Sequence, residues 1–494
     1  MTRLALLMLA LLGLRLASAS VVAQPGYTDA YYYADVAARF ARGLGLSADF
    51  VWNPIELGAL PVISHKFWMP LATVAQGAGI ASLGSLLGDF RAAQTAILLF
   101  AALVPLAAYA SARSLGTSER AGLAAAAFVG LGGLFAPAWV SLDGFAPAAL
   151  VGALFFIALA RAAAGDLRAG IACGVLVGLL YLTRAEGALC GVALLWLALH
   201  PASRRPGIAG AAVALLIGGA WLLRDISAGL PPDLFARTAL LVRYDDFFRV
   251  ASPTLDAYLR TLPDALGAKL AALLTNAVTF LFAFSLVLIW PLVRGVRDLW
   301  GRAEVRAWGA LGILVFAAQS LVWTLHSTRG SYFHSLAAFF PFGVAIAVAG
   351  GERLLASRRP DSARAWTWGA LLAVAVLSAA AVSQWDTSFN AGARTRAAAL
   401  DAIPDGPFLA IDAAAWRWLS GRSVFVTPAD GLDAATCLPG QGWRSIVLEE
   451  AHFAAYDDLY RGVSRPDWLG APVVRGGVKI FPVIAPIPLR CLVG

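Results

Sequence analysis

The sequence predicts an all-α polytopic membrane protein of about eleven transmembrane helices with a small C-terminal α/β soluble domain. Of its 494 residues, 60% are hydrophobic and only 14% are charged, and the mean hydropathy is +0.73. A water-soluble domain of this composition lacks the polar residues needed to cover its surface. Apolar runs long enough to cross a bilayer recur to about residue 383, where the pattern changes to short strands.

Eleven apolar segments are predicted to span the membrane, and a twelfth, glycine-rich stretch at 68–88 is predicted to lie at its surface. The first span ends in Ala17-Ser18-Ala19, which also fits a signal-peptidase site, so this span exports the chain whether it is cleaved or kept. The predicted spans are 4–22, 92–112, 120–139, 145–163, 170–183, 187–199, 208–223, 271–293, 307–325, 332–350 and 366–383.

These spans divide the chain into a membrane domain at 1–383, which includes a first exported loop at 24–67, and a soluble domain at 384–494. The soluble domain is predicted to contain strands at 407–412, 423–427, 445–449 and 477–482 between helices. Of the four cysteines, only Cys437 and Cys491 lie in this domain, where they could pair with each other in an oxidising compartment.

Arginines gather in five connectors between the predicted spans, at 113–120, 161–168, 204–205, 294–306 and 353–364. All five fall on one side of the membrane, which the positive-inside rule makes cytoplasmic. We therefore expect a bacterial inner membrane protein with a cytoplasmic N-terminus and a periplasmic C-terminal domain. The net charge of +8 then reflects topology and contact with membrane lipids, and no nucleic-acid partner is expected.

The first exported loop carries an acidic residue among aromatic ones, in the run Thr28-Asp29-Ala30-Tyr31-Tyr32-Tyr33, and it ends in Ser64-His65-Lys66-Phe67-Trp68-Met69-Pro70. A carboxylate at the lipid-water boundary suits a reaction on a membrane-bound substrate. Two structural interpretations stay open: the aromatics also mark an interfacial belt, and Asp29 also suits the N-cap of a following helix.

Asp29-Ala30-Tyr31-Tyr32 and His65-Lys66-Phe67-Trp68-Met69-Pro70-Leu71 resemble the motifs that open and close this loop in GT-C glycosyltransferases. The similarity is greatest to the family 39-like branch, which includes protein mannosyltransferases and aminoarabinose transferases. Those enzymes often have an Asp-Glu pair, whereas Ala30 replaces the second acid here. The resemblance therefore implies a single catalytic carboxylate, Asp29.

Two further polar turns are predicted on the exported face. Leu182-Thr183-Arg184-Ala185-Glu186-Gly187 resembles a Leu-Thr-Arg-Pro-Glu-Gly turn of the same enzymes, with Ala185 in place of proline. Charged residues so close to a membrane span indicate a functional site, although Arg184 and Glu186 could simply pair. The turn from His326 to His334 places His326, Arg329 and His334 together, where they could hold a phosphate or contact lipid head groups.

The resemblance implies an inverting hexosyl-type transfer from a polyprenyl-phosphate sugar donor to a glycan, lipid or protein acceptor. Asp29 would be the general base. Lys66, Arg184 and Arg329 would bind the donor phosphate. No spacing of acidic residues predicts a specific metal site, so no metal or other cofactor is expected. The alternatives are a transporter or flippase of lipid-linked saccharides, or a non-catalytic assembly protein. Other candidate site residues are His65, Glu186, His326, His334, Arg243 and Asp245.

Overall fold

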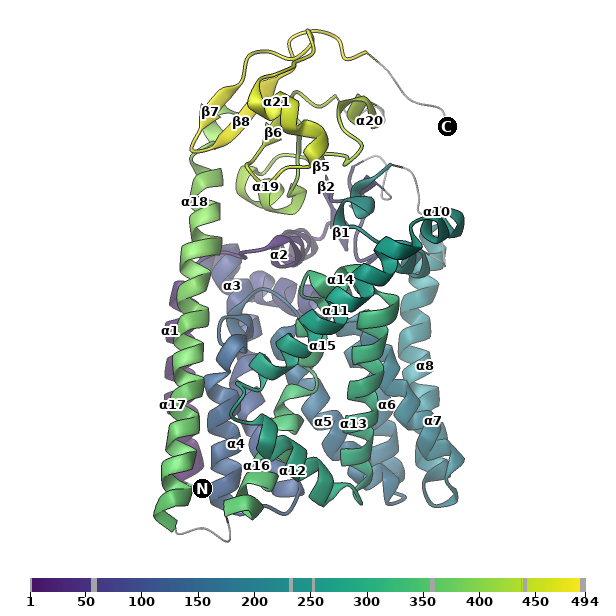
Figure 1. Ribbon diagram of the computed structural model, residues 1–494, viewed down its shortest axis with the longest axis vertical. Coiled ribbons are helices and arrows are strands. Elements are labelled where there is room, and N and C mark those ends of the chain that lie inside the picture. Colours follow the sequence, from purple (N-terminus) through teal and green to yellow (C-terminus); the bar gives the residue numbers. More distant parts are fainter. Residues whose placement is uncertain are drawn as a thin grey trace.

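A helical bundle carries a small sheet domain on one end. The computed structural model describes residues 2–54, 60–230, 234–250, 254–355, 360–436, 438 and 442–488. In Figure 1 the N-terminus and the start of α17 lie at the end of the bundle opposite the sheet domain. The bundle helices are α1 (Thr2–Val21), α3 (Leu71–Ser114), α4 (Glu119–Leu131), α5 (Phe145–Ala163), α6 (Leu167–Thr183), α7 (Gly191–Leu199), α8 (Arg204–Ser227), α11 (Leu262–Ala283), α12 (Ile289–Leu299), α13 (Ala303–Ala317), α16 (Phe340–Leu355) and α17 (Pro360–Trp385).

Among the described residues, seven helices are long and apolar enough to cross a membrane, and eight if the bent pair Glu119–Leu131 and Gly133–Val140 counts as one span. The chain is therefore a multi-pass membrane protein, but the predicted number of about eleven spans is not confirmed. Helices α6 and α7 are apolar but too short to meet the same length.

Several of the predicted spans are not single helices; besides those at 120–139, 187–199 and 307–325, two more are divided as follows. The span predicted at 271–293 is broken between α11 and α12, where Ser285 and Leu286 have φ angles of 53° and 57°. These angles lie in the left-handed region, which a right-handed helix excludes. The span predicted at 332–350 is likewise divided between α15 (Ser331–Leu336) and α16. Hydropathy does not report the break at Ser285 and Leu286, because apolar residues continue across it.

Helix α3 contains a break at Gly88, whose φ is 76° and ψ is 159°. Glycine adopts this conformation without the steric cost of a Cβ atom. The break divides α3 into a first helix, which corresponds to the stretch predicted to lie at the membrane surface, and a second helix, which contains the span predicted at 92–112.

Direct contacts tie the arginine-rich connectors together at one end of the bundle. The backbone N–H of Ser118 donates to Glu352 at 3.2 Å, and Arg302 donates to the carbonyl oxygen of Ser114 at 2.9 Å. Arg306 stacks over Trp196 with 5.8 Å between the guanidinium carbon and the ring centroid, which links these connectors to the end of α7. Connectors that the sequence predicts to lie on one side of the membrane are therefore in contact with one another in the structure.

The sheet domain contains six strands in the order β2-β5-β4-β6-β8-β7. The four strands from β2 to β6 are parallel, and β8 and β7 add to β6 as an antiparallel edge. The α/β character predicted for the soluble domain is confirmed, and each of the four predicted strands is present. The strands are β2 (Phe50–Val51), β4 (Phe408–Ala410), β5 (Val424–Val426), β6 (Ser445–Leu448), β7 (Val473–Arg475) and β8 (Val478–Pro482), with a separate pair β1 (Ser47–Ala48) and β3 (Val62–Ile63).

The loop at 24–67 packs as part of the sheet domain. It supplies the edge strand β2, and Tyr32, Phe50 and Trp52 are buried in the same hydrophobic core as the C-terminal strands. Helix α2 (Thr28–Ala41) lies between the sheet and the bundle (Figure 1). The remaining helices are α9 (Leu234–Arg237), α10 (Leu255–Arg260), α14 (Thr324–Thr328), α18 (Ala391–Ala397), α19 (Ala413–Ser420), α20 (Leu432–Thr436) and α21 (Asp457–Arg461).

The predicted Cys437–Cys491 pair lies outside the described residues, whereas Cys173 and Cys190 are free and buried.

Candidate active site

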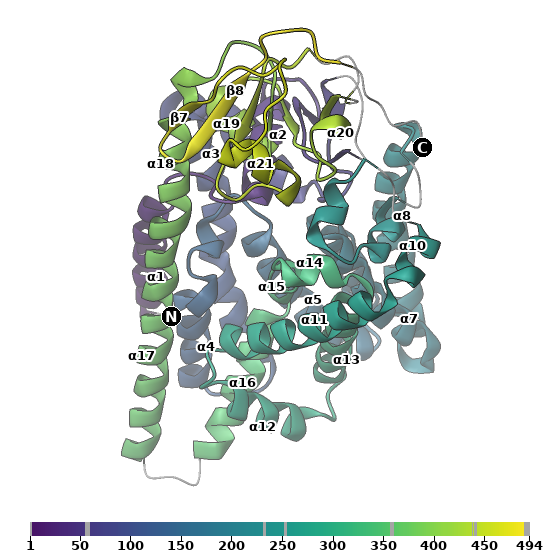
Figure 2. The same ribbon diagram turned by 45° about the horizontal axis from the view of Figure 1, so that its top comes forward.

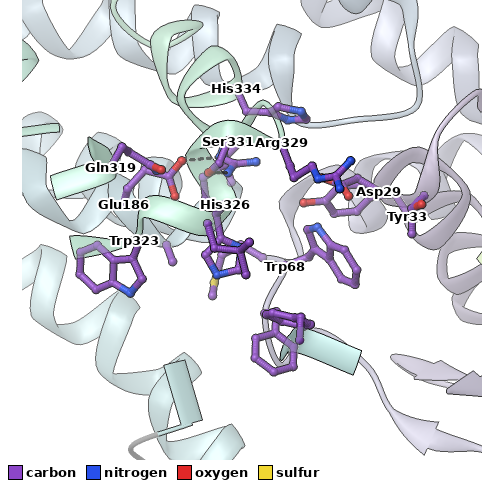
Figure 3. Close-up of a pocket in the computed structure, with 18 of the residues that line it drawn as sticks. Asp29, Tyr33, Trp68, Glu186, Gln319, Trp323, His326, Arg329, Ser331 and His334 are labelled. Atoms are coloured by element: carbon purple, nitrogen blue, oxygen red, sulfur yellow. Dashed lines mark hydrogen bonds and ion pairs between the residues drawn. The ribbon is translucent and has the colours of Figure 1, made fainter. Parts of the chain in front are cut away.

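A cavity of about 480 Å³ lies at the end of the bundle that faces the sheet domain. Its walls come from segments far apart in the sequence: the start of α2, the end of the first loop, the turn after α6, the segment 244–247, and the stretch from 319 to 334. Six of the ten predicted site residues line it, namely Asp29, Arg184, Glu186, His326, Arg329 and His334. In Figure 3, Asp29 and Trp68 lie on one side of this cavity and Glu186 and Gln319 on the other.

Asp29 lies in the first turn of α2 and faces the cavity. The N-cap position of α2 is Tyr27, which makes no side-chain capping bond, so Asp29 is not the N-cap. Burial raises the pKa of the Asp29 carboxyl above its ordinary value, and the nearby Asp143 carboxylate raises it further, although His334 and Arg184 act in the opposite direction. A carboxylate in these surroundings binds a proton more readily than one in water.

Asp143 is the main site residue that sequence analysis missed. It is fully buried in the turn between η3 (Ala138–Val140) and α5, and its Oδ2 accepts a 2.6 Å hydrogen bond from the Tyr27 hydroxyl. His334 Nδ1 lies 3.4 Å from the same oxygen. Burial works to raise the pKa of Asp143, but His334 and the hydrogen bond from Tyr27 outweigh it and lower the pKa. The available signal was a lone acid in the short connector between the spans predicted at 120–139 and 145–163.

Arg184 and Glu186 form an ion pair in the turn between α6 and α7. Arg184 also donates to the Ser331 hydroxyl at 3.0 Å, and Glu186 accepts a hydrogen bond from the Ser335 hydroxyl. The turn is therefore anchored to α15 on the opposite wall. Both side chains also line the cavity. Arg184 and Glu186 can therefore pair with each other and still belong to a functional site.

Arg329 differs from Arg184 because no carboxylate lies within ion-pair distance of it among the described residues. Its side chain stacks on Tyr244, with 4.0 Å between the guanidinium carbon and the ring centroid. An arginine held by an aromatic ring keeps its hydrogen-bond donors free for an anionic ligand. His326, on the same turn, differs again, since burial lowers its pKa to about 4 and leaves its ring neutral near pH 7.

Aromatic side chains cover the cavity from the sheet side. Trp52 stacks on Phe247 with ring centroids 4.8 Å apart, and Trp68 lies 4.3 Å from Trp52. His65, beneath this layer, is fully buried, and its Nδ1 lies 3.1 Å from the Trp68 carbonyl oxygen. Burial lowers the pKa of His65 to about 3, so it supports Trp68 as a neutral ring.

Besides His65, three other predicted site residues are absent from the cavity lining. Lys66 is half-buried and is absent from the lining. Arg243 and Asp245 are exposed, and Arg243 forms a 2.7 Å ion pair with Asp264. The loop that carries them does reach the cavity, but through the aromatic neighbours Tyr244 and Phe247. The sequence predicted that this loop lies near the site. It did not predict which side chains of the loop point into the cavity.

One group of side chains in the described part of the chain could hold a metal ion. The ligand atoms of Asp29, Asp143 and His334 all lie within 4.8 Å of one another. Two carboxylates and an imidazole suit a divalent cation. Asp143 already has partners within the protein, since it accepts a hydrogen bond from Tyr27 and lies 3.4 Å from His334.

Comparisons with known proteins relate this fold to membrane glycosyltransferases. No protein-family model and no curated protein sequence matches the chain. The structure of ArnT from Cupriavidus metallidurans bound to undecaprenyl phosphate matches with a TM-score of 0.60, at 16% identity over 98% of each chain. An oligosaccharyltransferase from Archaeoglobus fulgidus matches with a TM-score of 0.53, at 12% identity over 90% of this chain and 69% of that one.

Both proteins are GT-C glycosyltransferases, and the chain has the fold of this class of membrane enzyme. The identities are too low for the alignment alone to assign a substrate or a catalytic residue. Those assignments depend on the cavity described above.

Proposed function

We propose that the protein transfers a hexose-type sugar from a polyprenyl-phosphate donor to an acceptor at the periplasmic face of a bacterial inner membrane. One observation carries this proposal: two side chains of suitable chemistry line the same cavity. They are Asp29, a carboxylate with a raised pKa, and Arg329, an arginine that has no carboxylate partner among the described residues. The cavity lies at the end of the bundle where a lipid-linked donor and a water-borne acceptor would meet. The likeness to a structure that binds undecaprenyl phosphate supports the donor class.

In this mechanism Asp29 is the general base. Its carboxylate accepts the proton of the acceptor hydroxyl while the hydroxyl oxygen bonds to the anomeric carbon. The bond between that carbon and the phosphate oxygen breaks, and the electron pair leaves with the polyprenyl phosphate. Attack from the face opposite the phosphate inverts the anomeric configuration.

Arg329 would stabilise the charge that grows on the departing phosphate, with Arg184 as a second donor across the cavity. Arg184 already forms an ion pair with Glu186. Arg329 would therefore supply most of the attraction to the departing phosphate. We also propose that no metal is obligatory, because the two arginines provide the positive charge that a cation would otherwise bring.

The test is transfer of radiolabelled sugar from polyprenyl-phosphate donors to endogenous acceptors in membranes that contain wild-type or Asp29→Asn protein. We expect the substitution to lower transfer by about 100-fold or more, as for loss of a general base. Asp401→Asn is the matched control, because Asp401 is exposed and distant from the cavity lining. Folding of each variant is checked by size-exclusion chromatography in detergent.

Undiminished transfer by a folded Asp29→Asn protein would remove Asp29 from the mechanism. Failure of the wild-type protein to use any donor would instead favour transport of lipid-linked saccharides. Repeating the assay after treatment with EDTA tests the metal proposal, and loss of transfer that Mg²⁺ or Mn²⁺ restores would overturn it.

A further inference from the structure

A second cavity lies at the edge of the bundle, separate from the candidate active site. It has a volume of about 990 Å³ and is lined from one side by α1 and from the other by α17 and the residues that follow it. These two helices lie side by side in both Figure 1 and Figure 2. It shares no lining residue with the cavity around Asp29.

The walls of this groove are mostly apolar and consist largely of small residues, with serines among the alanines. Ala17 and Val21 of α1 face Ala375, Ala379 and Val382 of α17 across it. Ala17 and Ala379 are exposed in the protein alone, although they belong to spans that a membrane would surround. An apolar channel of this kind fits a hydrocarbon chain.

One end of the groove is polar and carries one charge of each sign. Asp386 and Arg394 both line it and lie 3.7 Å apart, with 53% and 67% of their side chains exposed. Asn390, between them, is buried and joins the end of α1 by donating to the Val21 carbonyl oxygen at 2.8 Å. The segment Asp386–Asn390 is a π-helical turn, a feature common at functional sites.

The position of this polar end along α17 matches the membrane boundary. No charged residue occurs between Arg364 and Asp386. At 1.5 Å per residue the two lie about 33 Å apart along the helix, close to the ~30 Å thickness of the hydrocarbon core. Asp386 and Arg394 therefore lie at head-group depth, while the groove extends into the acyl-chain region.

We propose that this groove binds a bilayer phospholipid with a zwitterionic, primary-ammonium head group, as in phosphatidylethanolamine. Arg394 would hold the phosphate and Asp386 the ammonium, while an acyl chain follows the groove between α1 and α17. A phosphatidylglycerol head group would bring only negative charge to Asp386. The trimethylammonium of phosphatidylcholine has no N–H to donate to that carboxylate.

The bound lipid would touch the segment that supports the candidate active site. Trp385 and Phe389 flank Asp386 in the chain, and their ring centroids lie 5.9 Å and 5.7 Å from that of Tyr27. Tyr27 in turn donates to Asp143. The lipid head group would thus order the same turn that positions Tyr27, although its binding does not depend on any transferase activity.

The experiment is native mass spectrometry of the full chain after purification from nanodiscs that contain equal amounts of phosphatidylethanolamine, phosphatidylcholine and phosphatidylglycerol. We expect phosphatidylethanolamine to be retained several-fold over the other two. Arg394→Gln and Asp386→Asn should each reduce that preference, and Ala379→Phe, which fills the groove from an exposed position, should abolish retention. Arg353→Gln is the matched control, since Arg353 also lies 3.7 Å from an aspartate, Asp298, at the other end of the bundle.

Equal retention of the three lipids, preferential retention of phosphatidylglycerol, or unchanged retention by the Ala379→Phe protein would each overturn the proposal. If Ala379→Phe fails to fold, the variants Arg394→Gln and Asp386→Asn still test the lipid proposal, because both change exposed residues. Because the readout is bound lipid and not sugar transfer, its outcome is independent of the outcome for Asp29.

Discussion

The two aspartates of the candidate site have different surroundings, which supports different roles for them in the proposed reaction. Asp29 lines the cavity, and its pKa is raised by burial and by the charge of Asp143. Asp143 is enclosed, and its partners Tyr27 and His334 outweigh burial and lower its pKa. A pair of carboxylates with pKa values displaced in opposite directions divides into one that exchanges a proton and one that stays ionised. In the proposed mechanism, Asp29 is the first of these carboxylates and Asp143 is the second.

This division predicts the pH dependence of transfer. Asp29 must be ionised to accept a proton, so kcat/KM should fall as the pH drops through its raised pKa. In Asp143→Asn, the loss of a negative charge that raises the pKa of Asp29 should move this acidic limb to lower pH. The measurement is the pH profile of kcat/KM for the donor, with Asp401→Asn as control. An acidic limb that stays in place or moves to higher pH would contradict the assignment.

Arg329 provides a second prediction, because its charge is not neutralised by a carboxylate in the described part of the chain. Arg329→Gln should weaken donor binding by about 10- to 100-fold, as expected for loss of a charge-assisted hydrogen bond of ~1.5–3 kcal/mol. The protein should fold normally, since Arg329 is exposed.

The measurement for Arg329 is KM for the donor, compared with Arg260→Gln, in which an exposed arginine paired with Asp256 is changed in the same way. Partial rescue by Arg329→Lys would show that charge, and not only the guanidinium geometry, contributes. A KM unaffected by Arg329→Gln would place the donor phosphate elsewhere.

Sequence reasoning predicted residue types at the site better than side-chain directions. Asp29, Arg184 and Arg329 were chosen for their chemistry near a membrane boundary, and all three line the cavity. Lys66, which the resemblance to GT-C enzymes assigned to the donor phosphate, lies outside the lining. Asp143 was missed because its role depends on contact with Tyr27 and His334, and those contacts join segments more than a hundred residues apart.

Among the helices and strands, uninterrupted segments could be predicted from the sequence, whereas breaks within a helix could not. Helix α5 begins and ends at the predicted residues, and the four predicted strands are present. The break at Ser285 and Leu286 was missed because apolar residues continue across it. Strand β2 was missed because two residues of the first loop pair in parallel with β5, and so short a strand carries no periodic pattern.

A largely buried arginine on α18 forms ion pairs with the sheet domain, which supports a prediction about stability. Arg396 on α18 lies 3.2 Å from Asp412 and 3.0 Å from Glu449, which follow β4 and β6. These side chains are 14–19% exposed. Arg396→Gln would leave two carboxylates without their shared counter-charge, which costs about 3 kcal/mol when the pair is buried.

We expect Arg396→Gln to lower the Tm and to make the sheet domain sensitive to limited proteolysis while the helical bundle stays intact. Arg461→Gln is the control in the same domain, because Arg461 and Asp457 form an exposed pair that contributes little. Equal Tm values for the two variants would show that Arg396 does not hold the domain in place.

At the scale of the whole molecule, the charge distribution and the cavity define two different ends. The arginine-rich connectors meet at one end through contacts such as that between Ser118 and Glu352. The cavity, α2 and the sheet domain lie at the other end (Figure 1). The sequence indicated this polarity through the spacing of arginines, even though the number of spans that it predicted is not confirmed.

This polarity predicts the orientation of the protein in the membrane. By the positive-inside rule the arginine-rich end is cytoplasmic, so the sheet domain and the cavity face the periplasm. The test uses a chain whose four native cysteines are replaced by serine and which carries a single new cysteine, either Ser464→Cys in the sheet domain or Ala164→Cys in an arginine-rich connector. Both positions are exposed. In spheroplasts, a membrane-impermeant maleimide should label Ser464→Cys and leave Ala164→Cys unlabelled until the membrane is permeabilised. The reverse pattern would place the sheet domain in the cytoplasm, where a periplasmic acceptor could not reach Asp29, and would exclude the proposed reaction at that face.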